Sequence, residues 1–119
     1  MKQRIVVCCL VHRGNDYLFI KQDKSNGAYP NTYHIPGGGL DLGEDLEKGV
    51  RREVFEETNI NLKNVKKAHF DYDLLDYYKG SPHQLIYLYY TAEYGSGEPT
   101  PKSDAKEIIW VNKKELRLL

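Results

Sequence analysis

The chain has 119 residues, of which 40% are hydrophobic and 29% are charged, as is typical of one globular domain covering residues 1–119. Lys plus Arg and Asp plus Glu number 17 each, so the formal net charge is zero. This balance argues against nucleic acid as the main partner, because binding to a phosphate backbone relies on excess positive charge. A small phosphorylated ligand stays open. No apolar run approaches the roughly 20 residues that span a bilayer, so we expect no membrane partner.

The first third of the chain predicts strands. The apolar run at 4–12 is continuous rather than alternating, which predicts a strand covered on both faces. Turn residues follow it, and 17–22 then predicts the returning strand of a hairpin. Residues 23–32 predict a loop, and 33–35 a short strand that Pro36 ends.

Two cysteines, Cys8 and Cys9, are neighbours in the first predicted strand. Adjacent strand residues point to opposite faces, so no bridge between them is expected. They also lack the spacing of a zinc site. We therefore expect two buried free thiols and a cytoplasmic, reducing compartment.

The rest of the chain predicts one central helix among further strands. Asn59 follows the helix where a left-handed residue is expected. Glycines 37–39 predict a backbone that can approach a ligand closely, and a tight turn is the simpler interpretation. The other expected elements are a helix at 44–58, strands at 66–78, 84–94 and 105–111, a hairpin connection at 79–83 and a loop at 95–104. This order predicts an α/β fold with a mixed sheet between helical layers.

A capping box formed by Asn112 and Glu115 predicts a terminal helix. That helix reaches Leu119 after barely two turns, which leaves open whether the natural chain continues. A short closing helix would leave sheet surface that a second copy can cover, so a homodimer stays open.

Three glutamates cluster at the end of the central helix. Glu53, Glu56 and Glu57 have i, i+3, i+4 spacing, so like charges lie close together. They also occupy the last turns, where the helix dipole disfavours acids. Glu57 shares the direction of the apolar stripe formed by Leu46, Val50 and Val54. A solvated acidic face does not explain an inward carboxylate, whereas a hard divalent cation such as Mg²⁺ reverses each penalty.

The same segment resembles the Nudix box. Gly38 and Glu44 stand at the required spacing before the helix, and the helix supplies Arg52, Glu53, Val54, Glu56, Glu57 and Ile60. Asn59 replaces the family's glycine, a mild departure because asparagine also tolerates a left-handed conformation. Segments 33–44 and 107–116 resemble the family's entry and closing segments. The resemblance implies an α/β/α sandwich whose box forms a loop–helix–loop.

The resemblance also implies a hydrolytic site. Glu53, Glu56 and Glu57, with a backbone carbonyl of Gly37 or Gly38, would bind Mg²⁺ or Mn²⁺. Arg52 and Glu44 would orient the cluster, and Gly39 would complete the glycine segment. Glu56 or Asp104 would act as the general base, with Glu107 as the neighbour to test next. Lys21, at a strand end, is a candidate phosphate ligand, although a surface lysine is its simpler interpretation.

The substrate is less defined. The flanks 1–11 and 29–44 resemble the family's enterobacterial nucleoside triphosphatases that favour pyrimidine deoxynucleotides, which implies a pyrophosphohydrolase releasing a nucleoside monophosphate and pyrophosphate. ADP-ribose or a nucleotide sugar is the alternative substrate, and a non-catalytic nucleotide-binding module is the alternative class. The ten tyrosines include candidates for base stacking, but at strand spacing most are more simply explained by packing.

Overall fold

The computed structural model describes residues 1–22 and 32–118, so the loop predicted at 23–32 lies almost wholly outside the described residues. Strands dominate, with one long helix between β4 and β5. The elements are β1 (Lys2–Arg13), β2 (Asp16–Gln22), β3 (Tyr33–His34), β4 (Gly37–Gly39), α1 (Leu46–Thr58), β5 (Asn61–Tyr78), β6 (Ser81–Ser96), β7 (Ala105–Asn112) and the 3₁₀ helix η1 (Glu115–Leu118).

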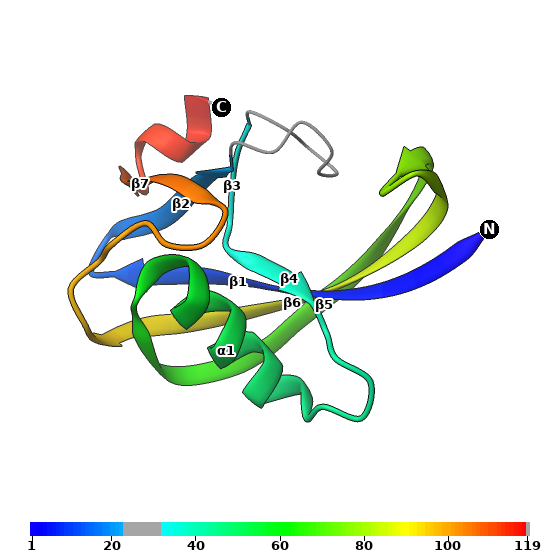
Figure 1. Ribbon diagram of the computed structural model, residues 1–119. Helices are drawn as coiled ribbons and strands as arrows, with labels where there is room; N and C mark the ends of the chain where they lie inside the picture. Colours follow the sequence, from blue (N-terminus) through cyan, green and yellow to red (C-terminus); the bar gives the residue numbers. More distant parts are fainter. Residues whose placement is uncertain (23–31, 119) are drawn as a thin grey trace.

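The strands form one mixed, strongly curved sheet (Figure 1). Its main order is β3-β2-β1-β6-β5, with β4 paired to β1 and β7 paired to β2. β1 lies parallel to β6 and antiparallel to its other neighbours. The predicted α/β class and mixed sheet are therefore confirmed. The pairing also explains why β1 is apolar throughout its middle: neighbouring strands and α1 leave Val7, Cys9 and Val11 fully buried.

The glycines 37–39 form strand β4 rather than the predicted tight turn. They pair with Val6–Cys8 of β1. A Cβ added at Gly37 would collide with the backbone oxygen of Val7, so a side chain there is incompatible with this close pairing. Glycine usually weakens a strand. Here the close approach of the β4 and β1 backbones explains why glycines occupy these strand positions.

The long hairpin differs from its predicted limits. β5 begins at Asn61, five residues earlier than expected, and the connection is only Lys79–Gly80 instead of 79–83. Both turn residues have positive φ, 49° and 86°, as the two-residue turns of twisted hairpins require. Figure 1 shows this hairpin and the N-terminal end of β1 reaching away from α1.

The helix begins at Leu46, with Asp45 as its N-cap. The carboxylate of Asp45 accepts a 3.1 Å hydrogen bond from the Lys48 amide. The predicted helix begins at residue 44, with Glu44 in its first turn. In the structure Glu44 instead precedes the helix. At the other end Asn59 is left-handed, with φ 64°, which confirms the sequence prediction.

The apolar stripe of α1 packs into one core on its side of the sheet. Val50 and Val54 are at most 1% exposed, and Leu46 packs against their cluster. The other buried members are Val7, Cys9, Val11, Leu18, Ile60, Leu62, Tyr90 and Ala92. Both cysteines are buried and free, as predicted from their position in a strand.

The C-terminal prediction was wrong in detail. The Asn112 side chain accepts a hydrogen bond from the Lys114 amide at 3.0 Å rather than from Glu115, and a four-residue 3₁₀ helix follows. Within the described residues, the second helical layer of the expected sandwich is limited to this element. No described helix is long and apolar enough to cross a membrane.

Candidate active site

A cleft of about 690 Å³ opens beside the C-terminal half of α1. One end holds the carboxylates of the helix and the glycine strand. The other end is formed by β1, β6 and the turn of the β5–β6 hairpin. The lining residues used below are Arg4, Val6, Cys8, Gln22, Gly37, Gly38, Gly39, Glu53, Glu56, Glu57, Leu85, Tyr87 and Asp104.

Glu57 is the most buried carboxylate of the cleft, with 5% of its surface exposed. One oxygen accepts a 2.8 Å hydrogen bond from the Gly37 amide, and the other a 2.9 Å bond from Gln22 Nε2. Both donors are neutral. Burial raises the pKa of Glu57 to about 7, because these two bonds do not offset desolvation and the nearby charges of Glu53 and Asp104.

Glu53 lies one turn earlier on the same side of the helix, with 14% of its side chain exposed. Burial raises its pKa, while the ion pair with Arg52 opposes the shift. A Cβ at Gly38 would collide with the Glu53 carboxylate. The bare backbone of β4 therefore leaves the space in which this carboxylate sits.

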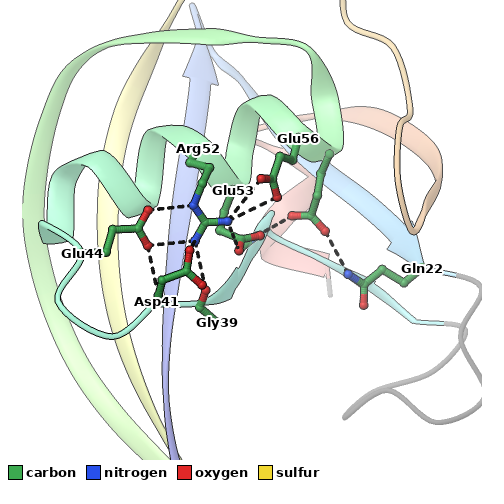
Figure 2. Close-up of polar contacts among 9 residues, drawn as sticks. Gln22, Gly39, Asp41, Glu44, Arg52, Glu53 and Glu56 are labelled. Carbon is green, nitrogen blue, oxygen red and sulfur yellow. Dashed lines mark hydrogen bonds and ion pairs between the residues drawn. The ribbon is translucent and has the colours of Figure 1, made fainter.

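Arg52 connects the acidic groups, as Figure 2 shows. Its Nη1 donates to Glu53 at 2.8 Å and to both oxygens of Glu56 at 3.3 Å. Its Nη2 also donates to the Gly39 carbonyl at 3.1 Å. The guanidinium thus tethers the helix carboxylates to the glycine strand.

Glu44 holds the other side of the same guanidinium. Its two oxygens accept bonds from Arg52 Nε and Nη2 at 2.7 and 2.9 Å (Figure 2). Glu44 lies in the loop before α1, and this position allows a direct contact across eight residues of sequence. These bonds lower the pKa of Glu44 to about 2 and raise that of Arg52.

The backbone of β4 presents alternating edges, since adjacent residues of an antiparallel ladder alternate in direction. The Gly37 amide and the Gly39 carbonyl both bond to side chains of α1. Gly38, between them, therefore faces β1. This alternation favours the carbonyl of Gly37 over that of Gly38 as a backbone ligand.

The donor set fits a hard divalent cation. Two of the three helix carboxylates are desolvated, and Arg52 provides the positive charge that Glu53 and Glu56 contact. In the arrangement described, no three Asp, Glu, His or Cys side chains of residues 1–22 and 32–118 converge on one point suitable for an ion. Glu57 is turned to Gly37 and Gln22 instead, so side-chain rotation must accompany binding.

The remaining predicted residues divide into two groups. Asp104 lines the cleft and is near enough to raise the pKa of Glu57. Lys21 and Glu107 are not among the described lining residues. The Lys21 ammonium lies 3.9 Å from Glu107 and 5.7 Å from the Tyr33 ring centroid, so it participates in a separate surface cluster.

Sequence reasoning missed the residues that the strands contribute to the cleft, among them Arg4, Cys8, Gln22 and Tyr87. A charged residue at the start of an apolar strand was the available signal for Arg4. No local pattern marks the others, because their places depend on how β1, β2 and β6 lie around the helix.

Comparisons with known proteins show which chains this one resembles. The family model of the NUDIX domain matches residues 1–119. The nucleoside triphosphatase NudI of Enterobacter sp. (strain 638) is 30% identical over 125 residues, which cover 100% of this chain and 89% of that protein. The MutT protein of Methanosarcina mazei Go1 superposes with a TM-score of 0.83 at 21% identity, covering 99% of this chain and 83% of that one. A MutT NUDIX hydrolase from Burkholderia pseudomallei gives 0.80 at 24% identity, covering 94% and 84%.

Fold, motif and relatives therefore define a small nucleotide-directed hydrolase of the Nudix type. The chain belongs to the Nudix family.

Proposed function

We propose that this chain hydrolyses a phosphoanhydride bond of a nucleoside triphosphate, ribo or deoxy, to give the monophosphate and pyrophosphate. The observation that carries the proposal is the buried Glu57 beside Glu53 and Glu56 at one end of a nucleotide-sized cleft. The similarity to a protein named nucleoside triphosphatase supports the choice of substrate class.

Glu53, Glu56 and Glu57, with the carbonyl of Gly37 rather than that of Gly38, are the proposed ligands of Mg²⁺ or Mn²⁺. The chemistry that a bound divalent cation supplies is neutralisation of the diphosphate charge and activation of water. Arg52 and Glu44 act as positioning residues, because they fix the carboxylates against β4.

The chain's own part in the reaction is proton transfer and orientation. Glu56 or Asp104 takes a proton from the attacking water. The water oxygen forms a bond to phosphorus and the P–O bond bridging the α- and β-phosphates breaks; pyrophosphate leaves after attack at the α-phosphorus, and the monophosphate leaves after attack at the β-phosphorus. Attack at the α- or the β-phosphorus gives the same products. The side chain of Glu56 is 49% exposed and Asp104 lines the cleft, so both are accessible to water.

The test is a panel of nucleoside triphosphates, ADP-ribose and a nucleotide sugar with Mg²⁺. Inorganic pyrophosphatase converts released pyrophosphate to phosphate, and a phosphatase reports the other products. Wild type is compared with Glu57→Gln and with Glu47→Gln, a matched control on the exposed side of α1 where Glu47 pairs with Arg51.

Turnover of triphosphates that Glu57→Gln abolishes and Glu47→Gln retains is the expected result. Turnover of ADP-ribose or the nucleotide sugar alone would transfer the proposal to those substrates. Nucleotide binding without turnover of any compound would indicate a binding module instead.

We also propose a homodimer through the edge strand β5. Phe70, Tyr72 and Leu74 are 55–78% exposed along it, and β5 pairs only with β6 in the described sheet. Its first half is basic (Lys63, Lys66, Lys67) and its second half acidic (Asp71, Asp73, Asp76), so an antiparallel twofold pairing opposes unlike charges. Light scattering after gel filtration tests it: a dimer is expected, and a monomeric mass refutes it.

The cytoplasm remains the proposed compartment. The support is the pair of buried free thiols, which suits a reducing environment.

A further inference from the structure

Arg4 places a cation in the cleft next to bare backbone. It stands on β1 two residues from Val6 and four from Cys8, all of which line the cleft, as the alternation of strand side chains requires. Its guanidinium lies against Gly39, where an added Cβ would collide with it. Gly39 therefore provides the room that this side chain occupies.

The hydrogen bonds of Arg4 are incomplete. Its Nε is buried and has no hydrogen-bond partner among the described residues. A buried donor left unsatisfied destabilises the folded state. Such a group needs an explanation, and in a ligand cleft an acceptor on the ligand is one.

The surroundings of Arg4 suit a flat aromatic ligand. In the sheet Arg4 is opposite Leu85, and Val6 is opposite Tyr87. The Tyr87 ring stacks with Tyr89 at 6.0 Å between centroids and 24° between planes. Apolar side chains beside a tyrosine face form a surface on which a nucleobase can stack.

The two ends of the cleft are separated along β1. Glu57 is bonded to Gly37, which is opposite Cys8, whereas Arg4 comes four residues earlier on that strand. The guanidinium of Arg4 reaches back to Gly39, which is opposite Val6, so it lies two strand residues, roughly 7 Å, from the Gly37–Cys8 pair. A nucleotide with its phosphates at the glutamates therefore extends its base toward Val6, Tyr87 and Arg4.

We propose that Arg4 is a specificity-determining residue that donates to a carbonyl oxygen of the nucleobase, with the base stacked near Tyr87, and that it discriminates against adenine. The inference rests on the proposed function and names the part of the substrate that this end of the cleft reads. Uracil, thymine, cytosine and guanine carry a ring carbonyl, and adenine has none.

The discrimination follows from the donor inventory. Arginine has only donors, and adenine carries an amino donor at the position where guanine, uracil and thymine carry a carbonyl, while the acceptors of adenine are ring nitrogens at other positions. A donor facing a donor leaves both without a partner, and a site built for hydrogen bonding rejects such a base strongly. Glutamine can donate or accept, so Arg4→Gln removes the discrimination, whereas Arg4→Lys keeps donors only.

Two other roles make different predictions. Arg4 is near enough to Glu53 to favour its ionised form, although burial has the larger effect on the pKa of that carboxyl. It can also contact a phosphate oxygen. Neither role depends on the base, so each predicts that Arg4→Gln affects all nucleotides equally and that Arg4→Lys restores them equally.

The test measures kcat/KM for dUTP and dATP with Mg²⁺ in wild type, Arg4→Gln, Arg4→Lys and the surface control Lys48→Gln. Wild type and the control are expected to prefer dUTP. Arg4→Gln should lower the dUTP/dATP ratio by on the order of tenfold, and Arg4→Lys should retain it. Gly39→Ala, which displaces the guanidinium without removing its charge, should also lower the ratio if Arg4→Gln does not fold. A wild type without preference, or equal losses on both nucleotides, overturns the inference.

Equilibrium binding of dUMP and dAMP separates this result from failure of the proposed function. If wild type turns over no nucleotide, the hydrolase proposal fails, but tighter binding of dUMP that Arg4→Gln abolishes still supports the inference. Equal binding of dUMP and dAMP by wild type refutes it.

Discussion

Replacement of Glu57 by glutamine separates the free energy that burial of this carboxylate costs the fold from its proposed role in binding metal. The carboxylate has a pKa of about 7, raised from 4.5 mainly by burial. Since the folded state holds its proton more tightly than the unfolded state, ionisation destabilises the fold as pH rises from 4.5 to 7. One pKa unit corresponds to about 1.4 kcal/mol, so the full change is about 3 kcal/mol.

Glutamine resembles the protonated carboxyl and does not titrate. Without divalent metal, the free energy of unfolding of Glu57→Gln relative to wild type is therefore expected to rise by about 3 kcal/mol between pH 4.5 and pH 8. The substitution also changes the Glu57 oxygen that accepts from Gln22. This adds a contribution to the free energy of unfolding that does not vary with pH. Urea unfolding in EDTA at several pH values measures the difference, with Glu47→Gln as the control.

Mg²⁺ should reverse the order of stability of wild type and Glu57→Gln. A ligand at 100 times its dissociation constant stabilises the folded state by about 2.7 kcal/mol, and this gain is expected in wild type and reduced in Glu57→Gln. A stability difference that stays constant with pH in EDTA would refute the desolvation argument. Equal stabilisation of both proteins by Mg²⁺ would remove Glu57 from the ligand set.

Three further outcomes are expected. Gly37→Ala should unfold at lower urea concentration, because its Cβ would meet the backbone of β1. Gly38→Ala should stay folded by circular dichroism but bind Mg²⁺ more weakly, because its Cβ would displace Glu53. Asn59→Ala should lower the free energy of unfolding by about 1–2 kcal/mol, since alanine is strained at φ 64°, and Asn59→Gly should stay closer to wild type in the same urea assay. Glu44 has a folded pKa of about 2, so its stabilisation is complete above pH 4.5 and lost as pH falls toward 2; the stability difference between wild type and Glu44→Gln, followed by urea unfolding, should shrink over that window and be constant above it.

The central helix shows how far local sequence can predict a site. Its apolar stripe placed Glu57 inward, and the structure confirms the burial. The repulsive i, i+3, i+4 spacing of the glutamates predicts a functional cluster. Asn59 likewise indicated the end of the helix. These features depend on helix geometry alone, which neighbouring residues fix.

Contacts between distant segments required the fold. The direct Arg52–Glu44 bonds depend on a loop that bends back beside the helix, and the limits of α1 depend on which residue caps it. The glycine strand could not be recognised, because its strand geometry comes from pairing with β1 and its glycines have little strand propensity of their own.

The sequence alone determined the family, the helix and its acidic cluster, because these reside in short-range spacing. Only the tertiary structure decided which other side chains share the cleft. Arg4, Gln22 and Tyr87 come from three strands, and their proximity to the glutamates follows from the strand order and curvature of the sheet. Those properties arise from long-range pairing, which no local pattern records.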